Sequence, residues 1–176
     1  PGEAGLYGNF RPYWTRKNDQ WALPADWDPQ WPVVAVNIED VCAFAAWISE
    51  QQGRNCRLPT EEEWEKAARG GLHNKNYPWG SYIDGAKANY RLSGDPFDDG
   101  SSPVGYYNSN QIITAADLSL DGEKKFPTDQ ANGFGLYDVI GNVSEWCWDW
   151  FDENWYSRKN RTNTFKKELD ISCVFL

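Results

Sequence analysis

The fold is decided by residues 133–150, which read Gly133-Phe134-Gly135-Leu136-Tyr137-Asp138-Val139-Ile140-Gly141-Asn142-Val143-Ser144-Glu145-Trp146-Cys147-Trp148-Asp149-Trp150. Glycines, acids and large aromatics stand side by side here, a mixture that neither a regular helix nor a regular strand requires. The glycines indicate turns with positive φ or a close backbone approach, where a Cβ would clash. The first half of this stretch therefore predicts an acidic, glycine-bent loop.

The second half of the stretch alternates tryptophan with other residues at positions 146, 148 and 150. A period of two is typical of a half-buried strand, so the tryptophan face is predicted to enter the core. Cys147 lies inside this strand, and we interpret both Cys147 and Cys42 as small buried apolar residues.

Two carboxylates, Asp138 and Glu145, flank the predicted loop, and the backbone carbonyls of Gly141 and Val143 lie between them. Oxygen ligands in an irregular loop suit Ca²⁺, which accepts six to eight of them in flexible geometry. The alternative is that both carboxylates accept backbone N–H bonds of the loop and bind no ion. From these residues alone both interpretations stay open, and the second is favoured.

Upstream of this stretch the chain predicts a short apolar strand, residues 32–36, followed by a helix, residues 38–52. Asn37 is placed as the N-cap, and Glu39 and Asp40 fall in the first turn, where the helix dipole favours acids. Apolar residues then recur at helical spacing, and Gly53 ends the helix. A disulfide between Cys42 and Cys56 would span the end of this helix, but spacing alone does not establish it.

A second helix is predicted to follow Pro59. Thr60-x-x-Glu63 forms a capping box, and Gly70-Gly71 ends the helix. Trp64, Ala67 and Ala68 mark its buried side. Residues 1–31 predict coil, the chain from this helix to residue 107 is rich in turns, and residues 108–130 predict a surface insertion.

The composition limits the classes of function. The 176 residues suffice for one domain with a core, and the net charge of −9 argues against nucleic acid or an anionic membrane as a partner. No apolar run approaches the roughly 18 residues of a membrane span. The single histidine, His73, excludes a histidine-rich metal site. The chain begins at Pro1, so we expect a processed product or an excised piece, and the compartment cannot be inferred.

Several ordered motifs carry a family resemblance: RLPTEEEWEKAARGG at 57–71, YPWG at 77–80, Ala88-Asn89, Pro103-Val104-Gly105 and GLYDVIGNVSEW at 135–146. Together they resemble the formylglycine-generating enzyme, or sulfatase-modifying factor, family. The resemblance is strongest over residues 32–156 and implies a single domain, residues 1–176, with an atypical tail at 157–176. It implies a C-type-lectin-like α+β fold, with two helices, short antiparallel strands and long ordered loops.

The resemblance also implies two calcium sites. The first uses a side-chain oxygen of Asp138, the carbonyls of Gly141 and Val143, and the Glu145 carboxylate, which makes calcium the favoured interpretation of the loop. The second uses Asn89, the carbonyl of Tyr90 and a further acid, for which Asp98 and Asp99 are the candidates.

Catalytic members of this family oxidise a substrate cysteine with oxygen and a pair of their own cysteines that hold Cu(I). Soft thiolates suit Cu(I), so that chemistry needs two thiols together. The pair follows the tryptophan-rich strand in the family, whereas this sequence offers Cys173 with no second cysteine four or five residues away. No catalytic residue is therefore assigned.

Two hypotheses remain. In the first, which we favour, the chain is a calcium-stabilised, non-catalytic scaffold that binds a protein, peptide or glycan through its loops. In the second, it is a truncated or altered copper-dependent oxidase that converts a substrate cysteine to formylglycine and lacks its catalytic cysteine segment here. The sequence gives no indication of the oligomeric state.

Overall fold

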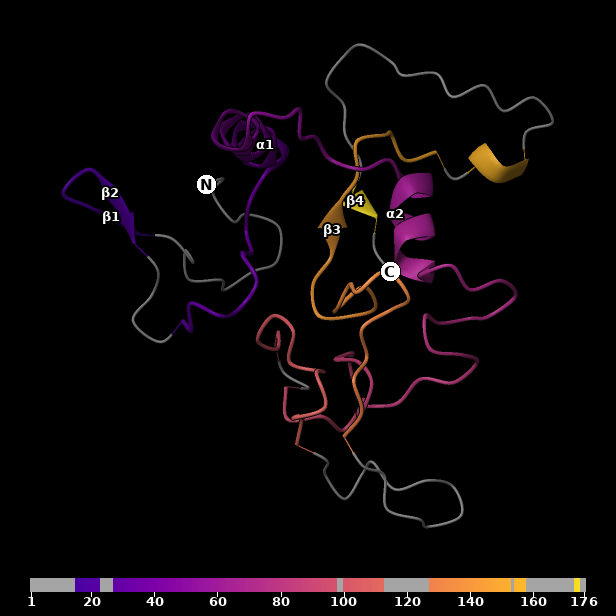
Figure 1. The fold of residues 1–176 in the computed structure, drawn as a ribbon. Helices are drawn as coiled ribbons and strands as arrows, with labels where there is room; N and C mark the ends of the chain where they lie inside the picture. Colours follow the sequence, from indigo (N-terminus) through magenta and orange to yellow (C-terminus); the bar gives the residue numbers. More distant parts are fainter. Residues whose placement is uncertain are drawn as a thin grey trace. The chain divides into compact units, whose positions relative to one another are not determined.

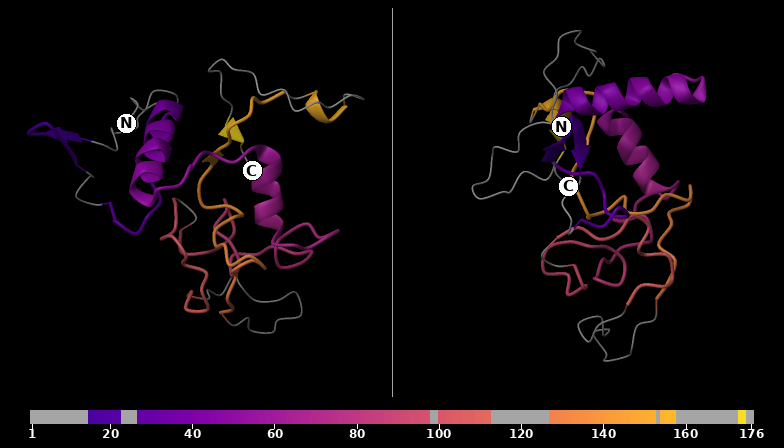
Figure 2. Two further views of the ribbon diagram at one scale, coloured as in Figure 1. Left: turned by 45° about the horizontal axis from the view of Figure 1, so that its top comes forward. Right: turned by 90° about the vertical axis from the view of Figure 1, so that its left-hand side faces the viewer.

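The computed structural model describes residues 15–22, 27–97, 100–112, 127–152, 154–157 and 173–174. Its chain divides into two compact units, one of residues 1–36 and 65–143 and the other of residues 37–64 and 144–176. Figures 1 and 2 show helices and short strands joined by long irregular loops in the described chain. The single domain over residues 1–176 stays a prediction.

Helix α1 (Ile38–Gln52) has the bounds expected from the sequence. Asn37 caps it, accepting a 2.8 Å hydrogen bond from the Asp40 N–H, while the Asp40 side chain accepts one from the Asn37 N–H. Gly53 ends the helix with a φ of 62°. None of the fifteen residues of α1, all of them described, is buried. The apolar residues that recur at helical spacing are half-buried, so both the caps and the apolar period agree with the structure.

Helix α2 (Glu61–Arg69) also begins and ends as predicted. The Thr60–Glu63 capping box is present: the Glu63 carboxylate accepts from the Thr60 N–H at 2.9 Å, and the Glu63 N–H donates to the Thr60 hydroxyl at 3.2 Å. Of the three residues expected on its buried side, Ala68 is buried, whereas Trp64 and Ala67 are partly exposed.

The C-terminal end of α2 is packed against the start of the 133–150 stretch, within the first unit. The Asn132 side-chain amide donates to the Ala67 carbonyl at 2.7 Å and to the Ala68 carbonyl at 3.1 Å. A Cβ on Gly133 would lie 2.2 Å from the Gly70 carbonyl oxygen. The expected close backbone approach at Gly133 is therefore present.

The tryptophan strand is much shorter than predicted. Strand β3 comprises only Glu145–Trp146 and pairs antiparallel with β4 (Cys173–Val174). Beyond it Cys147 is 2% exposed, while Trp148 and Trp150 are 40% and 39% exposed. The prediction of a tryptophan face in the core is therefore wrong, because alternation separates two faces without telling which one is buried. The buried interpretation holds for Cys147, whereas Cys42 is partly exposed.

Two other predictions on the N-terminal side are corrected. Residues 32–36 form no strand, and Ala35 has a φ of 56°, which breaks an extended run. Part of the expected coil is instead a hairpin of β1 (Thr15–Lys17) and β2 (Gln20–Ala22). Its turn residues Asn18 and Asp19 both have positive φ, as a two-residue hairpin turn requires. Residues 1–14 lie outside the described part.

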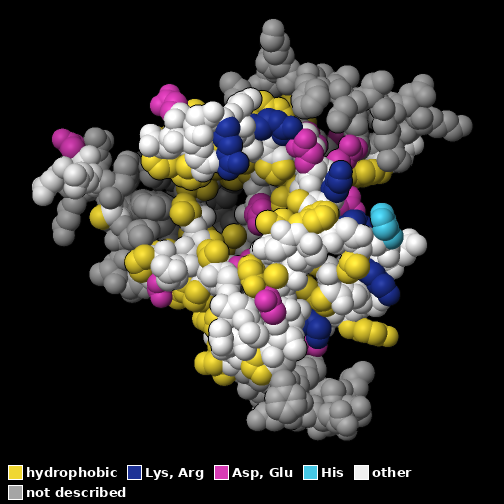
Figure 3. Space-filling model, in the orientation of Figure 1, with side chains coloured by type: hydrophobic (Ala, Val, Ile, Leu, Met, Phe, Trp, Pro, Cys, Tyr) yellow, Lys and Arg dark blue, Asp and Glu magenta, His cyan; other side chains and the backbone are white. Residues whose placement is uncertain are grey.

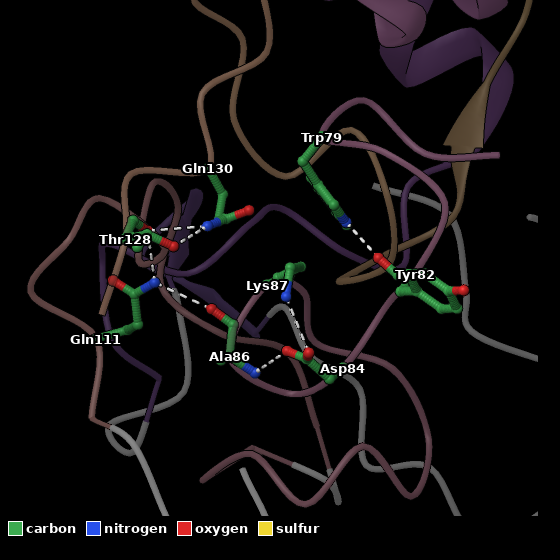
Figure 4. A network of polar contacts seen from close by, with 8 residues as sticks. All are labelled: Trp79, Tyr82, Asp84, Ala86, Lys87, Gln111, Thr128 and Gln130. Atoms are coloured by element: carbon green, nitrogen blue, oxygen red, sulfur yellow. Dashed lines mark hydrogen bonds and ion pairs between the residues drawn. The ribbon is translucent and has the colours of Figure 1, made fainter. Parts of the chain in front are cut away.

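The turn-rich part of the first unit is held by polar side chains rather than by strands. The buried Gln111 side chain donates to the Ala86 carbonyl at 3.0 Å and to the Thr128 carbonyl at 2.8 Å, as Figure 4 shows. An isolated bridge pairs Asn108 with Asp129. The predicted insertion at 108–130 therefore begins and ends on one polar network, and residues 113–126 lie outside the described chain.

The remaining elements complete the described chain. A short 3₁₀ helix, η2, spans Trp155–Ser157. Cys42 and Cys56 are both free thiols, so the disulfide considered between them is absent. His73 lies at the surface (Figure 3, cyan). Among the residues that the structure describes, no helix is both long and apolar enough to cross a membrane.

Candidate metal centre

A sharp backbone corner lies at the centre of residues 133–150, the signature stretch. Asp138, Gly141 and Asn142 have φ values of 55°, 80° and 64°. A Cβ on Gly141 would lie 2.0 Å from the Asn89 carbonyl oxygen, so only glycine fits this position. The sequence correctly predicted a glycine-dependent bend, although not the partner that it approaches.

The corner is fixed to two other loops of the first unit by Asn142. Its backbone N–H donates to the Asn89 carbonyl at 2.8 Å. Its side-chain oxygen accepts from the Ser102 N–H at 2.9 Å, and its amide donates back to the Ser102 carbonyl at 3.3 Å. Three segments far apart in the sequence therefore meet at one residue. Sequence reasoning did not select Asn142, although its place after Gly141 in a left-handed turn is typical of asparagine.

Asp138 has one satisfied and one unsatisfied oxygen. Its Oδ2 accepts a 2.6 Å hydrogen bond from the Gly105 N–H, while its buried Oδ1 has no hydrogen-bond partner among the described residues. Burial raises the pKa of Asp138, and the Gly105 N–H acts in the opposite direction. A buried acceptor without a donor is costly, so this oxygen is suited to a cation.

The carbonyl oxygens of Gly141 and Val143 are also available. Neither accepts a hydrogen bond from any residue in the described ranges. Both residues are half-buried, so the two carbonyl oxygens are free to accept a ligand or water.

Glu145 lies in the second unit, at the start of β3. Its Oε2 accepts a 2.7 Å hydrogen bond from the indole N–H of Trp64, and its side chain is exposed. The carboxylate thus has one partner from α2 and a second oxygen that can bind a ligand. Sequence reasoning selected Glu145 but missed Trp64, which it had interpreted only as a buried helix residue.

The residues expected for a second site are only partly described. Asn89 is buried, and its side-chain amide donates to the Gly100 carbonyl at 2.8 Å. The Tyr90 carbonyl accepts from the Ser93 N–H at 3.0 Å. Asp98 and Asp99 lie outside the described residues, so the acid of this site stays a prediction.

One buried acid that the sequence analysis did not select is already saturated. Asp95 accepts hydrogen bonds from the Phe97 N–H at 2.6 Å, from the Tyr107 hydroxyl at 3.2 Å and from the Ser93 hydroxyl. Burial, followed by the charge of Asp95, raises the pKa of Tyr107. Because its donors are all protein groups, we interpret Asp95 as a structural residue. An aspartate that begins a turn is the signal that could have found it.

Side chains alone do not make a metal site here. Among the described residues, no three His, Cys, Asp or Glu side chains gather closely enough to hold a metal ion. A cation at the corner would therefore depend on backbone carbonyls in addition to carboxylates, as calcium sites do.

Comparison with known families decides what kind of domain this is. The family model described as "Sulfatase-modifying factor enzyme 1-like domain" matches residues 9–171. The chain belongs to the sulfatase-modifying factor family. The match confirms the family that the motifs indicated, and with it the fold of that family.

Similar members of the family bear different names. A formylglycine-generating enzyme of Thermomonospora curvata is 36% identical over 132 residues, which cover 75% of this chain and 38% of that protein. A Bos taurus protein named "Inactive C-alpha-formylglycine-generating enzyme 2" is 39% identical over 121 residues, covering 66% of this chain and 32% of that protein. The chain therefore spans only about a third of the length of these two relatives.

A solved structure supports the same assignment. The chain resembles the structure of PvdO from Pseudomonas aeruginosa with a TM-score of 0.52 and 27% identity, over 85% of this chain and 49% of that one. The sulfatase-modifying factor fold therefore agrees in sequence and in structure.

Proposed function

We propose that this chain is a calcium-stabilised, non-catalytic binding scaffold on the C-type-lectin-like α+β fold of the sulfatase-modifying factor family. The observation that carries the proposal is the buried Oδ1 of Asp138, which has no hydrogen-bond partner within the described ranges. A carboxylate oxygen withdrawn from water without a donor is stabilised by a cation. Calcium is the cation that an oxygen-only set in a bent loop fits.

Four residues would hold the ion: Asp138 through its side chain, Gly141 and Val143 through their carbonyls, and Glu145 through its carboxylate. Bound calcium would supply charge compensation to the buried carboxylate of Asp138. The residues themselves do the remaining work, since Gly141 permits the close approach to Asn89 and Asn142 fixes the corner to Ser102. A second ion at Asn89, Tyr90 and Asp98 or Asp99 belongs to the same proposal.

One observation supports a non-catalytic role. A relative of 39% identity is named an inactive formylglycine-generating enzyme. Cys42, Cys56 and Cys147 are free thiols, and none of them is assigned to a Cu(I) pair, so no step through copper is derived.

The second candidate is the copper-dependent oxidation of a peptide cysteine to formylglycine. The 36% identity to a formylglycine-generating enzyme favours it. It requires a thiol pair of the kind that binds Cu(I). Oxygen-dependent loss of thiol from a cysteine-containing peptide, catalysed by the copper-loaded protein, would establish this activity in place of the scaffold.

The binding role proposed for the scaffold rests on its exposed aromatic side chains. Trp148, Trp150, Phe151 and Tyr156 are exposed in the second unit. Aromatic rings of this kind bind apolar side chains and sugar faces, and the net charge of −9 disfavours nucleic acid. The proposed partner is therefore a protein, a peptide or a glycan.

The calcium proposal is tested by thermal unfolding with and without the ion. A ligand present at a hundredfold excess over its Kd stabilises the folded state by about 2.7 kcal/mol, which raises the Tm on the order of 5–10 °C. We expect this rise for the unchanged chain and for Glu62→Ala, which removes an exposed acid of α2. Glu145→Ala should abolish it. A Tm that is the same in calcium and in EDTA would contradict the proposal.

A further inference from the structure

The indole of Trp64 forms a hydrogen bond with Glu145, one of the proposed calcium ligands. Its Nε1 donates a 2.7 Å hydrogen bond to Oε2 of Glu145, from a position 81 residues earlier in the chain. An indole N–H is a donor only, so it holds a carboxylate oxygen and cannot accept a proton from it. A bond of this length to a charged acceptor is among the stronger side-chain hydrogen bonds.

Two further hydrogen bonds fix the register of this contact. The Trp148 N–H donates to the Pro59 carbonyl at 2.8 Å, and the Glu61 N–H donates to Asp149 Oδ1 at 2.8 Å. Both join the chain just beyond β3 to the N-terminal end of α2, one of them at Pro59, which precedes the helix. The first turn of α2 is therefore attached to residues 145–149 at Glu61 and Trp64, and Trp64 provides the contact that reaches the Glu145 side chain.

We infer that Trp64 is a positioning residue for the Glu145 carboxylate, an inference that rests on the proposed calcium function. With Oε2 held by the indole, the carboxylate has one orientation, and Oε1 is left for the ion. Partners that orient a ligand in this way typically change metal affinity 10- to 100-fold when they are removed. Because Trp64 belongs to α2, ion binding and the order of the first turn of α2 are coupled, each strengthening the other.

The test replaces Trp64 by Phe, which keeps an apolar ring and removes the N–H. We expect the Kd for Ca²⁺, measured by calorimetry, to rise roughly tenfold. The matched control is Trp79→Phe, because the Trp79 indole also donates a 2.8 Å bond, but to the backbone carbonyl of Tyr82 (Figure 4). That variant should bind Ca²⁺ as the unchanged chain does. Equal affinities for all three proteins would overturn the inference.

Terbium luminescence separates proximity from positioning. Tb³⁺ replaces Ca²⁺ in oxygen sites and is excited through a nearby indole, so Trp64→Phe should lower both the amplitude and the affinity of a Tb³⁺ titration. A lower amplitude with an unchanged midpoint would mean that the indole is near the ion without orienting its ligand, and the inference would be wrong. In a Glu145→Gln background, Trp64→Phe should add little further loss, whereas a full additional loss would indicate a merely structural role.

Glu145→Gln separates the two proposals. If this variant binds Ca²⁺ unchanged, the proposed function fails. If it binds weakly while Trp64→Phe binds normally, only the role of Trp64 fails. Should Trp64→Phe not fold, the indole N–H resonance of Trp64 in the unchanged chain provides the measurement. It should shift in proportion to calcium occupancy, and a resonance that does not respond would overturn the inference.

Discussion

Helices α1 and α2 have the same local signals and different surroundings. Each begins with a capping box and ends at a glycine of positive φ, Gly53 in α1 and Gly70 in α2. Around Gly53 a Cβ would meet nothing within 4 Å, whereas around Gly70 it would lie 2.6 Å from the Gly133 nitrogen. Local chemistry therefore sets where both helices begin and end, and only tertiary packing distinguishes them.

The difference identifies α2 as the helix to which the signature stretch is attached. Its C-terminal carbonyls accept hydrogen bonds from Asn132, and its first turn is held by Glu145 and Asp149. The same stretch carries the proposed calcium ligands. A helix with ordinary caps thus becomes part of the proposed calcium site through the residues that contact its two ends.

The largest difference in unfolding free energy is expected when the glycines that end the two helices, Gly53 and Gly70, are replaced by alanine. Gly53→Ala introduces only left-handed strain, which costs roughly 1–2 kcal/mol of unfolding free energy. Gly70→Ala adds to that strain an overlap with Gly133 and Asn132, so we expect a loss of about 3 kcal/mol or more. Urea denaturation followed by circular dichroism measures both. Equal losses of unfolding free energy in the two variants would show that the residues around Gly70 rearrange to accept the added methyl group.

A smaller difference in unfolding free energy is expected when the side chain that hydrogen-bonds to the C-terminal end of each helix is removed. Asn132→Ala removes two hydrogen bonds to α2 carbonyls, one of them to the buried Ala68. It also removes the acceptor of the Phe134 and Leu136 N–H groups, and should cost about 2 kcal/mol or more in total. Ser49→Ala in α1 removes a partly exposed hydroxyl that accepts from the Cys56 N–H at 2.8 Å and donates to the Ala45 carbonyl at 2.6 Å, and should cost about 1 kcal/mol. Chemical denaturation of both variants checks the order, and a larger loss for Ser49→Ala would reverse the comparison.

Features with local causes were predictable from the sequence. The bounds of both helices follow from caps at Asn37 and Thr60, and the close approach in the signature stretch follows from its glycines. The β1–β2 hairpin was readable too, because Asn and Asp at 18 and 19 tolerate positive φ, but the turn was missed in a stretch without a clear period.

Features with distant causes were not predictable. The donor to Asp138 is the N–H of Gly105, 33 residues away, and that of Glu145 is 81 residues away. No spacing rule connects such pairs. The period of two at Trp146, Trp148 and Trp150 predicted the wrong residues for the core, because burial depends on which segment covers the strand. The residue type of Cys147, a small apolar side chain, predicted its burial correctly.

The smallest effect concerns the pKa of Glu63, the acid of the α2 capping box. Arg57 donates bidentate bonds of 2.7 and 2.8 Å to Glu63, and these, with the Thr60 N–H, lower the pKa of Glu63 from its ordinary 4.5 to about 2. A lowered carboxyl pKa stabilises the fold above the ordinary value, and that stabilisation is lost as the pH falls from about 4.5 through about 2. The Tm advantage of the unchanged chain over Glu63→Gln should therefore shrink across this window.

Arg57→Gln tests the cause of that acidity. The Arg57 hydrogen bond is the largest contribution to the lowered pKa of Glu63. Its loss should raise the folded-state pKa toward 4.5 and so narrow the pH range over which stability is lost, while the Thr60 N–H keeps part of the shift. Both side chains are exposed, so solvent screens the pair and the change in Tm should be small. Melting curves between pH 2 and pH 6 measure it, and a window that is unchanged in Arg57→Gln would assign the lowered pKa to the cap alone. In that case the capping box alone would account for the acidity of Glu63, and the N-terminus of α2 would depend on no basic side chain.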